Sequence, residues 1–333
     1  MVRTVQQRTA RKARIAMQPQ MPRPPGPSGK AEAPPAGAID HIYVTLASES
    51  ERAAIEQELD AIAGKFGLRR MAPAVAESGT AQIDYALGRR RTHSVHLLVA
   101  PRRSRAARSS AESSGARLAI IIDDLGYDRA AADGVLALPW PLTVAVLPNL
   151  PHSWQAAEEA QRRGLEVLLH LPMQSENGAA PPESVELRAG MPAQEAQEIL
   201  ARMLESVPYV AGVNNHQGSL ATQDEKLMAA VMATLREREL FFIDSRTTAA
   251  SVAYAAAQRA GVPAAYRSVF LDDEPDRDSI LRQLRRAERQ AREQGWAIAI
   301  GHPHPVTLAV LRANLPQLEA RGFRFVFASE LVH

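Results

Sequence analysis

Residues 118–126 read Leu-Ala-Ile-Ile-Ile-Asp-Asp-Leu-Gly, an uninterrupted apolar run that ends in two aspartates. A short run that is apolar at every position is typical of a strand covered on both faces, as in a parallel sheet between layers of helices. The two aspartates that follow this run place two carboxylates at the carboxyl end of the predicted strand. Because active sites of parallel α/β folds lie at this end, the stretch predicts both a fold class and a place for chemistry.

Short apolar runs alternate with longer amphipathic stretches from residue 118 to residue 333. Asp224 can cap one of the helices, and glycines such as Gly261 and Gly295 stand where helices should end. The predicted strands are Leu118–Ile122, Leu142–Leu147, Glu166–Leu169, Tyr209–Val213, Leu240–Ile243, Ala265–Leu271, Ala297–Ile300 and Phe323–Phe327. This pattern predicts an α/β fold, an incomplete (seven-unit) or full (β/α) barrel over 118–333. A doubly wound open sheet has the same pattern, because sequence does not show closure.

The first 117 residues have a different character. Residues 1–37 are basic and proline-rich, with seven prolines between positions 18 and 36, which predicts an extended, disordered segment. Residues 38–100 alternate apolar and polar side chains around one helical stretch and predict a small β-α-β-β domain of the α+β class. Residues 101–117 mix arginine with serine and predict a linker.

The net charge of +2 hides a division along the chain. Residues 1–117 hold 19 of the 39 basic and 10 of the 37 acidic residues, a net of +9, whereas residues 118–333 carry −7. No aromatic residues interleave with the linker arginines, so we expect no nucleic-acid partner. The absence of cysteine excludes disulfides and thiolate metal sites.

The sequence predicts neither a membrane-spanning helix nor an export signal. No apolar run reaches the roughly 18–20 residues of a membrane helix, so we predict no transmembrane segment. The first twenty residues carry the charges of a targeting segment without the apolar stretch that should follow, which predicts no export signal.

Six predicted strands end in residues that can do chemistry. One such residue usually caps the next helix, but a ring of Asp, Asn, His and Ser predicts a functional site. Histidine and carboxylate ligands from separate strands suit zinc with an open position for water. A second carboxylate could then act as general base and His302 as general acid. The sequence has neither a Gly-x-Ser-x-Gly elbow nor a phosphate-binding loop, which disfavours serine catalysis and nucleotide binding.

Residues 118–333 resemble the divergent polysaccharide deacetylase family. The matching segments, in order, are Ile121-Ile122-Asp123-Asp124-Leu125-Gly126, His170-Leu171-Pro172-Met173, Asn215-His216-Gln217-Gly218-Ser219, Phe242-Ile243-Asp244-Ser245-Arg246 and Gly301-His302-Pro303. The resemblance implies an incomplete (β/α) barrel, a divalent metal (usually zinc), a carbohydrate substrate and a place in the periplasm or cell envelope.

The resemblance also implies roles for individual residues. Asp123 corresponds to the catalytic base and His302 to the acid, while Asp124, His170 and His216 correspond to the metal ligands. We assign substrate binding to the remaining polar residues of the ring, Asn215, Ser219, Asp244, Arg246 and Asp272. The family usually carries both metal histidines in one His-x-x-x-His stretch, which this sequence lacks.

These observations predict a metal-dependent hydrolase that removes an acyl group, with N-acetyl as the expected one, from a cell-envelope carbohydrate. The missing His-x-x-x-His stretch motivates an alternative. In that alternative, the chain is a non-catalytic carbohydrate-binding or regulatory protein that keeps the barrel and the metal site.

Overall fold

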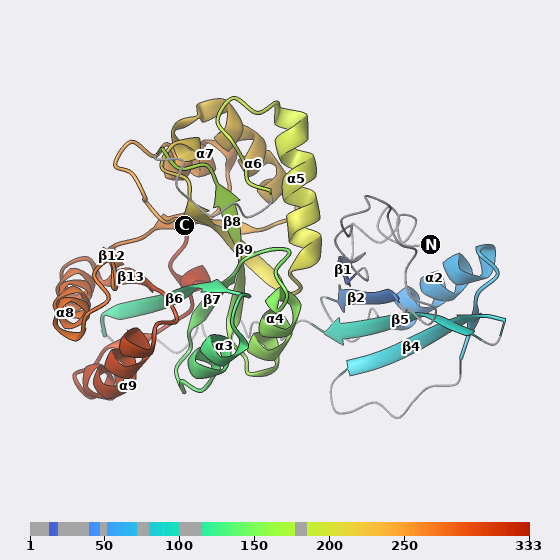
Figure 1. The fold of residues 1–333 in the computed structure, drawn as a ribbon, viewed down its shortest axis with the longest axis horizontal. Coiled ribbons are helices and arrows are strands. Elements are labelled where there is room, and N and C mark those ends of the chain that lie inside the picture. Colours follow the sequence, from blue (N-terminus) through green and yellow to red (C-terminus); the bar gives the residue numbers. More distant parts are fainter. Residues whose placement is uncertain are drawn as a thin grey trace, which may run out of the picture. The chain divides into compact units, whose positions relative to one another are not determined.

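The computed structural model describes residues 13–18, 40–46, 52–71, 80–88, 90–99, 115–176 and 185–333. The chain divides into two compact units, Met1–Ala111 and Glu112–His333. Each unit combines a sheet with one or more helices (Figure 1). Within the described ranges, no helix is long and apolar enough to cross a membrane.

The N-terminal unit is a five-stranded sheet with the helix α2 (Arg52–Lys65). In sheet order the strands are β1 (Ala13–Gln18), β2 (Asp40–Leu46), β5 (Arg90–Val99), β4 (Thr80–Leu87) and β3 (Arg69–Arg70). Ile55, Leu59 and Ile62 repeat at helical spacing, and they are buried in one cluster with Ile42 and Val95 of the sheet. This cluster is the core of the unit.

The elements predicted for 38–100 correspond to β2, α2, β4 and β5, and the structure adds β3. It also adds β1, which lies inside the segment 1–37 for which the composition predicts disorder. The six residues of β1 pair antiparallel with β2, from Ala13 opposite Leu46 to Gln18 opposite His41. The prediction of disorder therefore does not hold for this strand. The rest of 1–37, and most of the predicted linker 101–117, lie outside the described residues.

The C-terminal unit is built on a parallel sheet. Its strands are β6 (Arg117–Leu125), β7 (Thr143–Val146), β8 (Glu166–Met173), β9 (Val210–Gln217), β10 (Phe241–Asp244), β11 (Ala264–Tyr266), β12 (Val269–Phe270), β13 (Trp296–Gly301) and β14 (Arg324–Phe325). All eight predicted strands are present, and the one predicted at Ala265–Leu271 is divided into β11 and β12. The sheet order is β11-β10-β9-β8-β7-β6-β13-β12, and β14 pairs with β6.

The division between β11 and β12 shows how the sheet curves. Arg267 N–H donates to the carbonyl of Asp244 on β10 at 2.9 Å, whereas the next residue, Ser268, donates to Ile298 on β13 at 2.8 Å. These two strands lie near opposite ends of the sheet order. In a flat sheet of eight strands the ends would lie roughly 34 Å apart, but the residues that link β11 to β12 reach at most about 11 Å. The sheet therefore curls into an incomplete (β/α) barrel, which excludes the open-sheet alternative.

The side chains on the two faces of this sheet pack in separate apolar clusters. Within Leu118–Ile122, the even-numbered residues pack in the cluster shared with the helices, and Ala119 and Ile121 pack in an inner cluster. Asp123 is the next residue of the inner-facing series, because side chains alternate along a strand. The alternation thus directs one carboxylate of the pair into the barrel.

The C-terminal segment covers the amino ends of the strands. The backbone N–H of Ala328, in a short helical turn (Ala328–Glu330), donates to Thr143 Oγ1 at 3.0 Å. Ser329 N–H donates to Glu166 Oε1 at 3.0 Å, and Thr143 and Glu166 are the first residues of β7 and β8. Ala328 and Leu331 also belong to the inner cluster.

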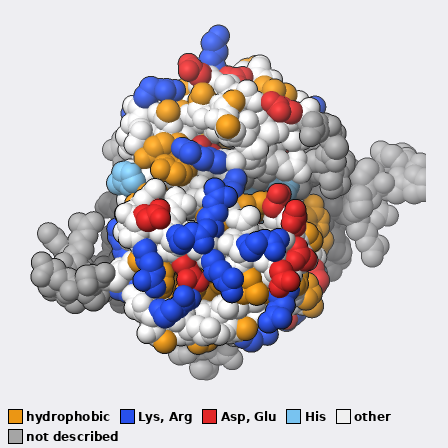
Figure 2. Space-filling model, turned by 90° about the vertical axis from the view of Figure 1, so that its left-hand side faces the viewer, with side chains coloured by type: hydrophobic (Ala, Val, Ile, Leu, Met, Phe, Trp, Pro, Cys, Tyr) orange, Lys and Arg blue, Asp and Glu red, His pale blue; other side chains and the backbone are white. Residues whose placement is uncertain are grey.

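The helices of this unit lie around the sheet (Figure 1). They are α3 (Arg129–Leu136), α4 (Ser153–Arg162), α5 (Ala193–Ser206), α6 (Glu225–Glu237), α7 (Ala253–Ala260), α8 (Arg277–Gln294) and α9 (Pro305–Ala320), and a short turn, Ala221–Gln223, precedes α6. Asp224 caps α6 as predicted, and Gly261 and Gly295 end α7 and α8 in the left-handed conformation. Figure 2 shows Lys and Arg side chains gathered on the side of α8, whose arginines are exposed.

Candidate metal and catalytic site

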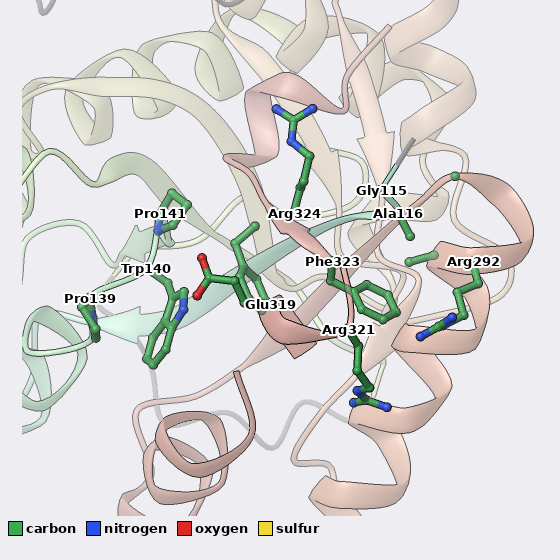
Figure 3. Close-up of a pocket in the computed structure, with 14 residues that line it drawn as sticks. Gly115, Ala116, Pro139, Trp140, Pro141, Arg292, Glu319, Arg321, Phe323 and Arg324 are labelled. Atoms are coloured by element: carbon green, nitrogen blue, oxygen red, sulfur yellow. The ribbon is translucent and has the colours of Figure 1, made fainter. Parts of the chain in front are cut away.

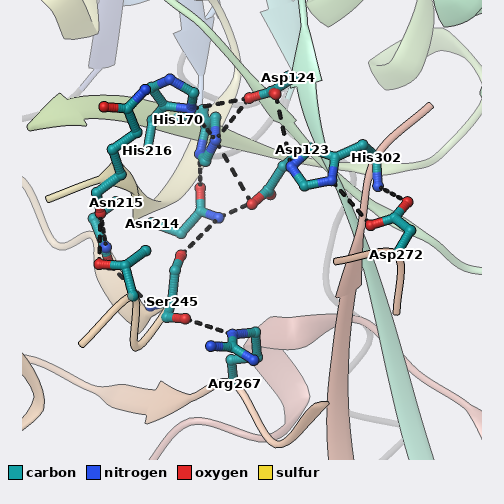
Figure 4. A network of polar contacts seen from close by, with 12 residues as sticks. Asp123, Asp124, His170, Asn214, Asn215, His216, Ser245, Arg267, Asp272 and His302 are labelled. Carbon is teal, nitrogen blue, oxygen red and sulfur yellow. Dashed lines mark hydrogen bonds and ion pairs between the residues drawn. The ribbon is translucent and has the colours of Figure 1, made fainter. Parts of the chain in front are cut away.

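Carboxylates and imidazoles from several strands meet at the carboxyl end of the barrel (Figure 4). Asp123 and Asp124 lie on β6, His170 on β8 and His216 on β9, while His302 directly follows β13. Each has a side-chain atom within 3.6 Å of another member of the group. We call these five residues the Asp–His cluster. They are the residues to which the sequence analysis assigns the metal and the catalytic groups.

The two aspartates reach the same histidine because the strand is irregular at this point. Asp124 has a φ of 61°, and the pairing of β6 with β7 shifts register between Ile122 and Leu125. This irregularity breaks the usual alternation of neighbouring side chains. As a result, His170 Nε2 lies 3.6 Å from Asp123 Oδ2 and 3.1 Å from Asp124 Oδ1. A left-handed conformation at a residue other than glycine costs about 1 kcal/mol or more and is held by its surroundings.

Three donor atoms from three strands converge within the cluster. Asp124 Oδ1 lies 3.1 Å from His170 Nε2 and 3.0 Å from His216 Nδ1, and the two nitrogens are 3.0 Å apart. Asp124 Oδ1 is buried and makes no hydrogen bond. Ligands held at about 2.0–2.2 Å from one zinc ion lie about 3 Å from each other. The spacing and the unsatisfied oxygen therefore fit a divalent metal ion.

The environments of the two aspartates push their pKa values in opposite directions. Burial raises the pKa of Asp123 above its ordinary value, although the charges of His170 and His302 act against this effect. Burial alone would also raise the pKa of Asp124, but its contacts with His170 and His216 outweigh that effect and hold the pKa well below its ordinary value. The lowered pKa of Asp124 favours its ionised form, and the raised pKa of Asp123 makes it the better proton acceptor of the two.

His302 is held by a buried carboxylate, Asp272, which follows β12. The Nδ1 of His302 lies 3.0 Å from Asp272 Oδ1, and its backbone N–H donates to Asp272 Oδ2 at 2.7 Å. Thr307 Oγ1 donates to the same Oδ2 at 2.7 Å. Asp272 is predicted to bind substrate, whereas in the structure both of its oxygens accept hydrogen bonds from the protein. This geometry leaves His302 Nε2 directed at the cluster, 3.6 Å from Asp124 Oδ2.

The same contacts change the pKa of His302. Burial would lower it, but the hydrogen bond to Asp272 and the charges of Asp124 and Asp123 raise it above its ordinary value. The pKa of Asp272 is lowered, because the hydrogen bonds from His302 and Thr307 outweigh its burial. A protonated imidazole beside an ionised carboxylate is the arrangement expected of a general acid.

A layer of polar contacts supports the cluster (Figure 4). Ser245 N–H donates to Asn215 Oδ1 at 2.8 Å, and Asn215 Nδ2 donates to the carbonyl of Gln217 at 2.7 Å. Arg267 Nε donates to the carbonyl of Ser245 at 2.5 Å. Asn215, which the sequence analysis assigns to substrate, thus joins the ends of β9 and β10.

Of the other residues assigned to substrate, Asp244 is the last residue of β10, while Ser219 and Arg246 lie in the loops after β9 and β10. Ser219 Oγ accepts a hydrogen bond from Glu176 N–H at 2.9 Å. Asp244 accepts hydrogen bonds from Arg246 N–H and from Ser251, at 2.8 and 2.9 Å. The guanidinium of Arg246 lies 3.9 Å from the centre of the Tyr266 ring. In these contacts Asp244 shows the loop-capping role that a polar residue at a strand end usually has.

A second group of side chains also has the composition of a metal site. Asp272, His302 and His304 bring three ligand atoms within 4.8 Å of one another. Both oxygens of Asp272 are already hydrogen-bonded, and His304 is exposed. The group is better explained as the support of His302.

A pocket of about 1220 Å³ lies at the other end of the barrel (Figure 3). Its lining comes from segments that precede strands, including Ala116 before β6, Pro141 before β7 and Gly295 before β13. Arg292 and Trp140 also line it. None of its lining residues belongs to the Asp–His cluster, so the pocket is separate from the candidate site.

Asn214 has no predicted role, but it lies at the centre of the site (Figure 4). Its side chain is fully buried and bridges Asp123 and His170, each at 2.9 Å. The predicted strand ends at Val213, but β9 continues to Gln217, so side chains still alternate. Because side chains alternate between the two faces of a strand, Asn214 and His216 lie on the same face. This alternation is the feature of the sequence that could have identified Asn214 as a site residue.

The chain resembles one protein family and several known proteins. The family model for divergent polysaccharide deacetylases matches residues 120–332. An uncharacterised protein of Haemophilus influenzae is 41% identical over 202 residues, which are 61% of this chain and 72% of that protein. The uncharacterised Escherichia coli protein YibQ is 43% identical over 203 residues, 60% of this chain and 63% of that protein. The chain thus spans less than two thirds of the length of YibQ.

A solved structure is also similar. It is that of an uncharacterised protein from Agrobacterium tumefaciens, with a TM-score of 0.64 and 28% identity. The similarity covers 67% of this chain and 91% of the other.

Proposed function

Because the chain belongs to the divergent polysaccharide deacetylase family, we propose that its Asp–His cluster binds one divalent metal ion and hydrolyses an acyl group from a carbohydrate. The family supports the carbohydrate class, and a cell-envelope polymer with N-acetyl groups is the substrate we propose within it. The donor set of two imidazoles and one carboxylate favours zinc.

One observation carries this proposal. Asp124 Oδ1, His170 Nε2 and His216 Nδ1 lie 3.0–3.1 Å from one another, and the oxygen is buried without a hydrogen bond. A buried carboxylate oxygen in this position is costly unless a cation satisfies it. We therefore assign the three residues as metal ligands. When bound, such an ion supplies Lewis-acid polarisation of the acyl oxygen and a lower pKa for water.

The remaining members of the cluster supply the proton transfers. Asp123 takes a proton from the water whose oxygen adds to the acyl carbon. His302 Nε2 gives a proton to the departing nitrogen as the carbon–nitrogen bond breaks, which yields a free carboxylate and an amine. Asp272 positions His302, since it holds Nδ1 and leaves Nε2 toward the site. Of the residues predicted to bind substrate, Ser219 and Arg246 remain proposed substrate contacts, since Ser219 is half-buried and Arg246 is exposed. The side chains of Asn215 and Asp244 are buried and bond within the protein.

Metal titration of the purified full chain tests the binding half of the proposal. We expect one equivalent of zinc or cobalt to bind, and Asp124→Ala and His170→Ala to abolish this binding. His304→Ala is the matched control, because His304 is an exposed histidine near the site that is not one of the three ligands. Wild-type protein that binds zinc no more tightly than the two ligand variants would contradict the metal site.

Acetate release from N-acetylated glycans tests the catalytic half. We expect Asp123→Asn to lower the rate by roughly 10²–10⁴-fold, the contribution typical of a general base, while metal binding persists. Tight glycan binding by the metal-loaded wild type with no acetate released would instead support the non-catalytic alternative.

A further inference from the structure

We propose that Asn214 is a positioning residue that keeps the proton of the neutral His170 ring on Nδ1, so that the Nε2 lone pair faces Asp124 and His216. The inference builds on the proposed metal site, but it concerns the protein's own hydrogen bonds. It makes a prediction for the metal-free chain.

The orientation of the Asn214 amide follows from its neighbours. Its side chain lies between Asp123 Oδ1 and His170 Nδ1, at 2.9 Å from each, and is fully buried. The amide Nδ2 donates to Asp123 Oδ1, because the proposed base accepts hydrogen bonds through its carboxylate oxygens. The same Nδ2 lies 3.4 Å from Ser245 Oγ, a second possible acceptor. The amide oxygen is therefore left to face His170.

This orientation decides the tautomer of the histidine. The Asn214 oxygen can only accept, so His170 Nδ1 must donate to it. In a neutral ring the other nitrogen then carries a lone pair, as a metal ligand requires. That nitrogen, Nε2, lies 3.1 Å from Asp124 Oδ1 and 3.0 Å from His216 Nδ1. One amide thus orients a proposed ligand and the proposed base together.

The fold holds this contact in place. His170 and Asn214 are direct partners in the pairing of β8 with β9, and Pro172 pairs with His216. Because alternate residues of a strand share a face, Asn214 and His216 lie on the same side and Asn215 on the other. Asn215 is thus a matched control, being a buried asparagine on the same strand whose hydrogen bonds go to Ser245 and Gln217.

Nitrogen-15 shifts of the His170 ring in the metal-free protein test the tautomer directly. We expect Nδ1 to stay protonated in wild-type protein and in Asn215→Leu, over a pH range that includes the neutral ring. In Asn214→Leu the acceptor is gone, and we expect the proton to move to Nε2. A neutral wild-type ring with its proton on Nε2 would overturn the proposal, whatever the protein hydrolyses or binds.

Zinc affinity provides a second readout. Loss of an outer hydrogen-bond partner of a metal histidine typically weakens metal binding by about 10–100-fold, and we expect this loss for Asn214→Leu but not for Asn215→Leu. Asn214→Asp keeps an acceptor for Nδ1 and should retain the wild-type tautomer if the leucine variant fails to fold. An equal loss of affinity in both leucine variants, with an unchanged His170 tautomer, would also refute the assignment.

Discussion

Replacement of Asp272 by asparagine removes the charge that holds His302 but keeps the shape of the side chain. In the folded chain, His302 Nδ1 lies 3.0 Å from Asp272 Oδ1, and the carboxylate is fully buried. A hydrogen bond to a charged group contributes about 1.5–3 kcal/mol. Its loss should therefore lower the pKa of His302 towards its ordinary value. Asp124 and Asp123 still face the imidazole in this variant and keep part of the effect.

The two pKa shifts also predict how the free energy of unfolding depends on pH. The folded-state pKa of His302 is raised, so its contribution is complete below the unfolded value of about 6.5 and is lost as pH rises through the folded pKa. The pKa of Asp272 is lowered, so its contribution is lost when pH falls through that lowered value. The difference in unfolding free energy between wild type and Asp272→Asn should therefore be largest in mild acid, between the two pKa values.

Proton NMR titration of the imidazole and urea unfolding at several pH values measure the two effects. Asp273→Asn is the matched control, because the neighbouring carboxylate is exposed and should hardly change the pKa of His302. If His302 is the general acid, the alkaline limb of the hydrolysis rate should move down in pH by the same amount as its pKa. A His302 pKa that changes no more in Asp272→Asn than in Asp273→Asn would refute the reasoning.

Substitutions at Asp224 and Gly212, each with a control substitution, test the fold. Asp224 caps α6 and accepts a hydrogen bond from Gly190 N–H at 2.7 Å, so Asp224→Ala should cost about 1–2 kcal/mol in urea unfolding, with a smaller loss for Asp224→Asn. The hydrogen bond from Gly190 and those of the cap lower the pKa of Asp224, so this stabilisation should fade as pH falls through that lowered value. Gly212→Ala would place a Cβ 2.6 Å from the buried ring of Phe241 and should cost about 1–3 kcal/mol. Gly64→Ala, where a Cβ meets nothing within 4 Å, should instead be neutral or stabilising; equal effects at both glycines would contradict the packing described.

Apolar patterning located the strands of the barrel because most of their residues are buried on both faces of the sheet. It did not predict the division of the strand at Ala265–Leu271, since consecutive residues there bond to different neighbours. Arg267 bonds to β10 and Ser268 to β13, a choice that depends on closure and not on local sequence. The strand Ala13–Gln18 was missed for a related reason. It pairs through backbone groups, which composition does not reveal.

The candidate site was predictable to the extent that parallel strands share one edge. That rule brings the pair Asp123-Asp124 together with His170 and His216, which lie far from it along the chain. The rule does not show which residues at strand ends bond to the following loop. The sequence alone therefore does not distinguish Asp244 from the residues of the Asp–His cluster. The hydrogen bonds of Asp244 to the loop that follows it depend on the local turn.

The dispersal of the three proposed ligands has a thermodynamic consequence. His170 and His216 are 46 residues apart in the chain and lie on different strands from Asp124. An unfolded chain presents no preformed site of this kind, whereas a single His-x-x-x-His stretch could still hold an ion locally. Free energy of metal binding at such a site therefore adds almost entirely to the folded state, about 2.7 kcal/mol when free metal is 100 times the dissociation constant. The concentration of free metal would then determine the stability of the barrel as well as its activity.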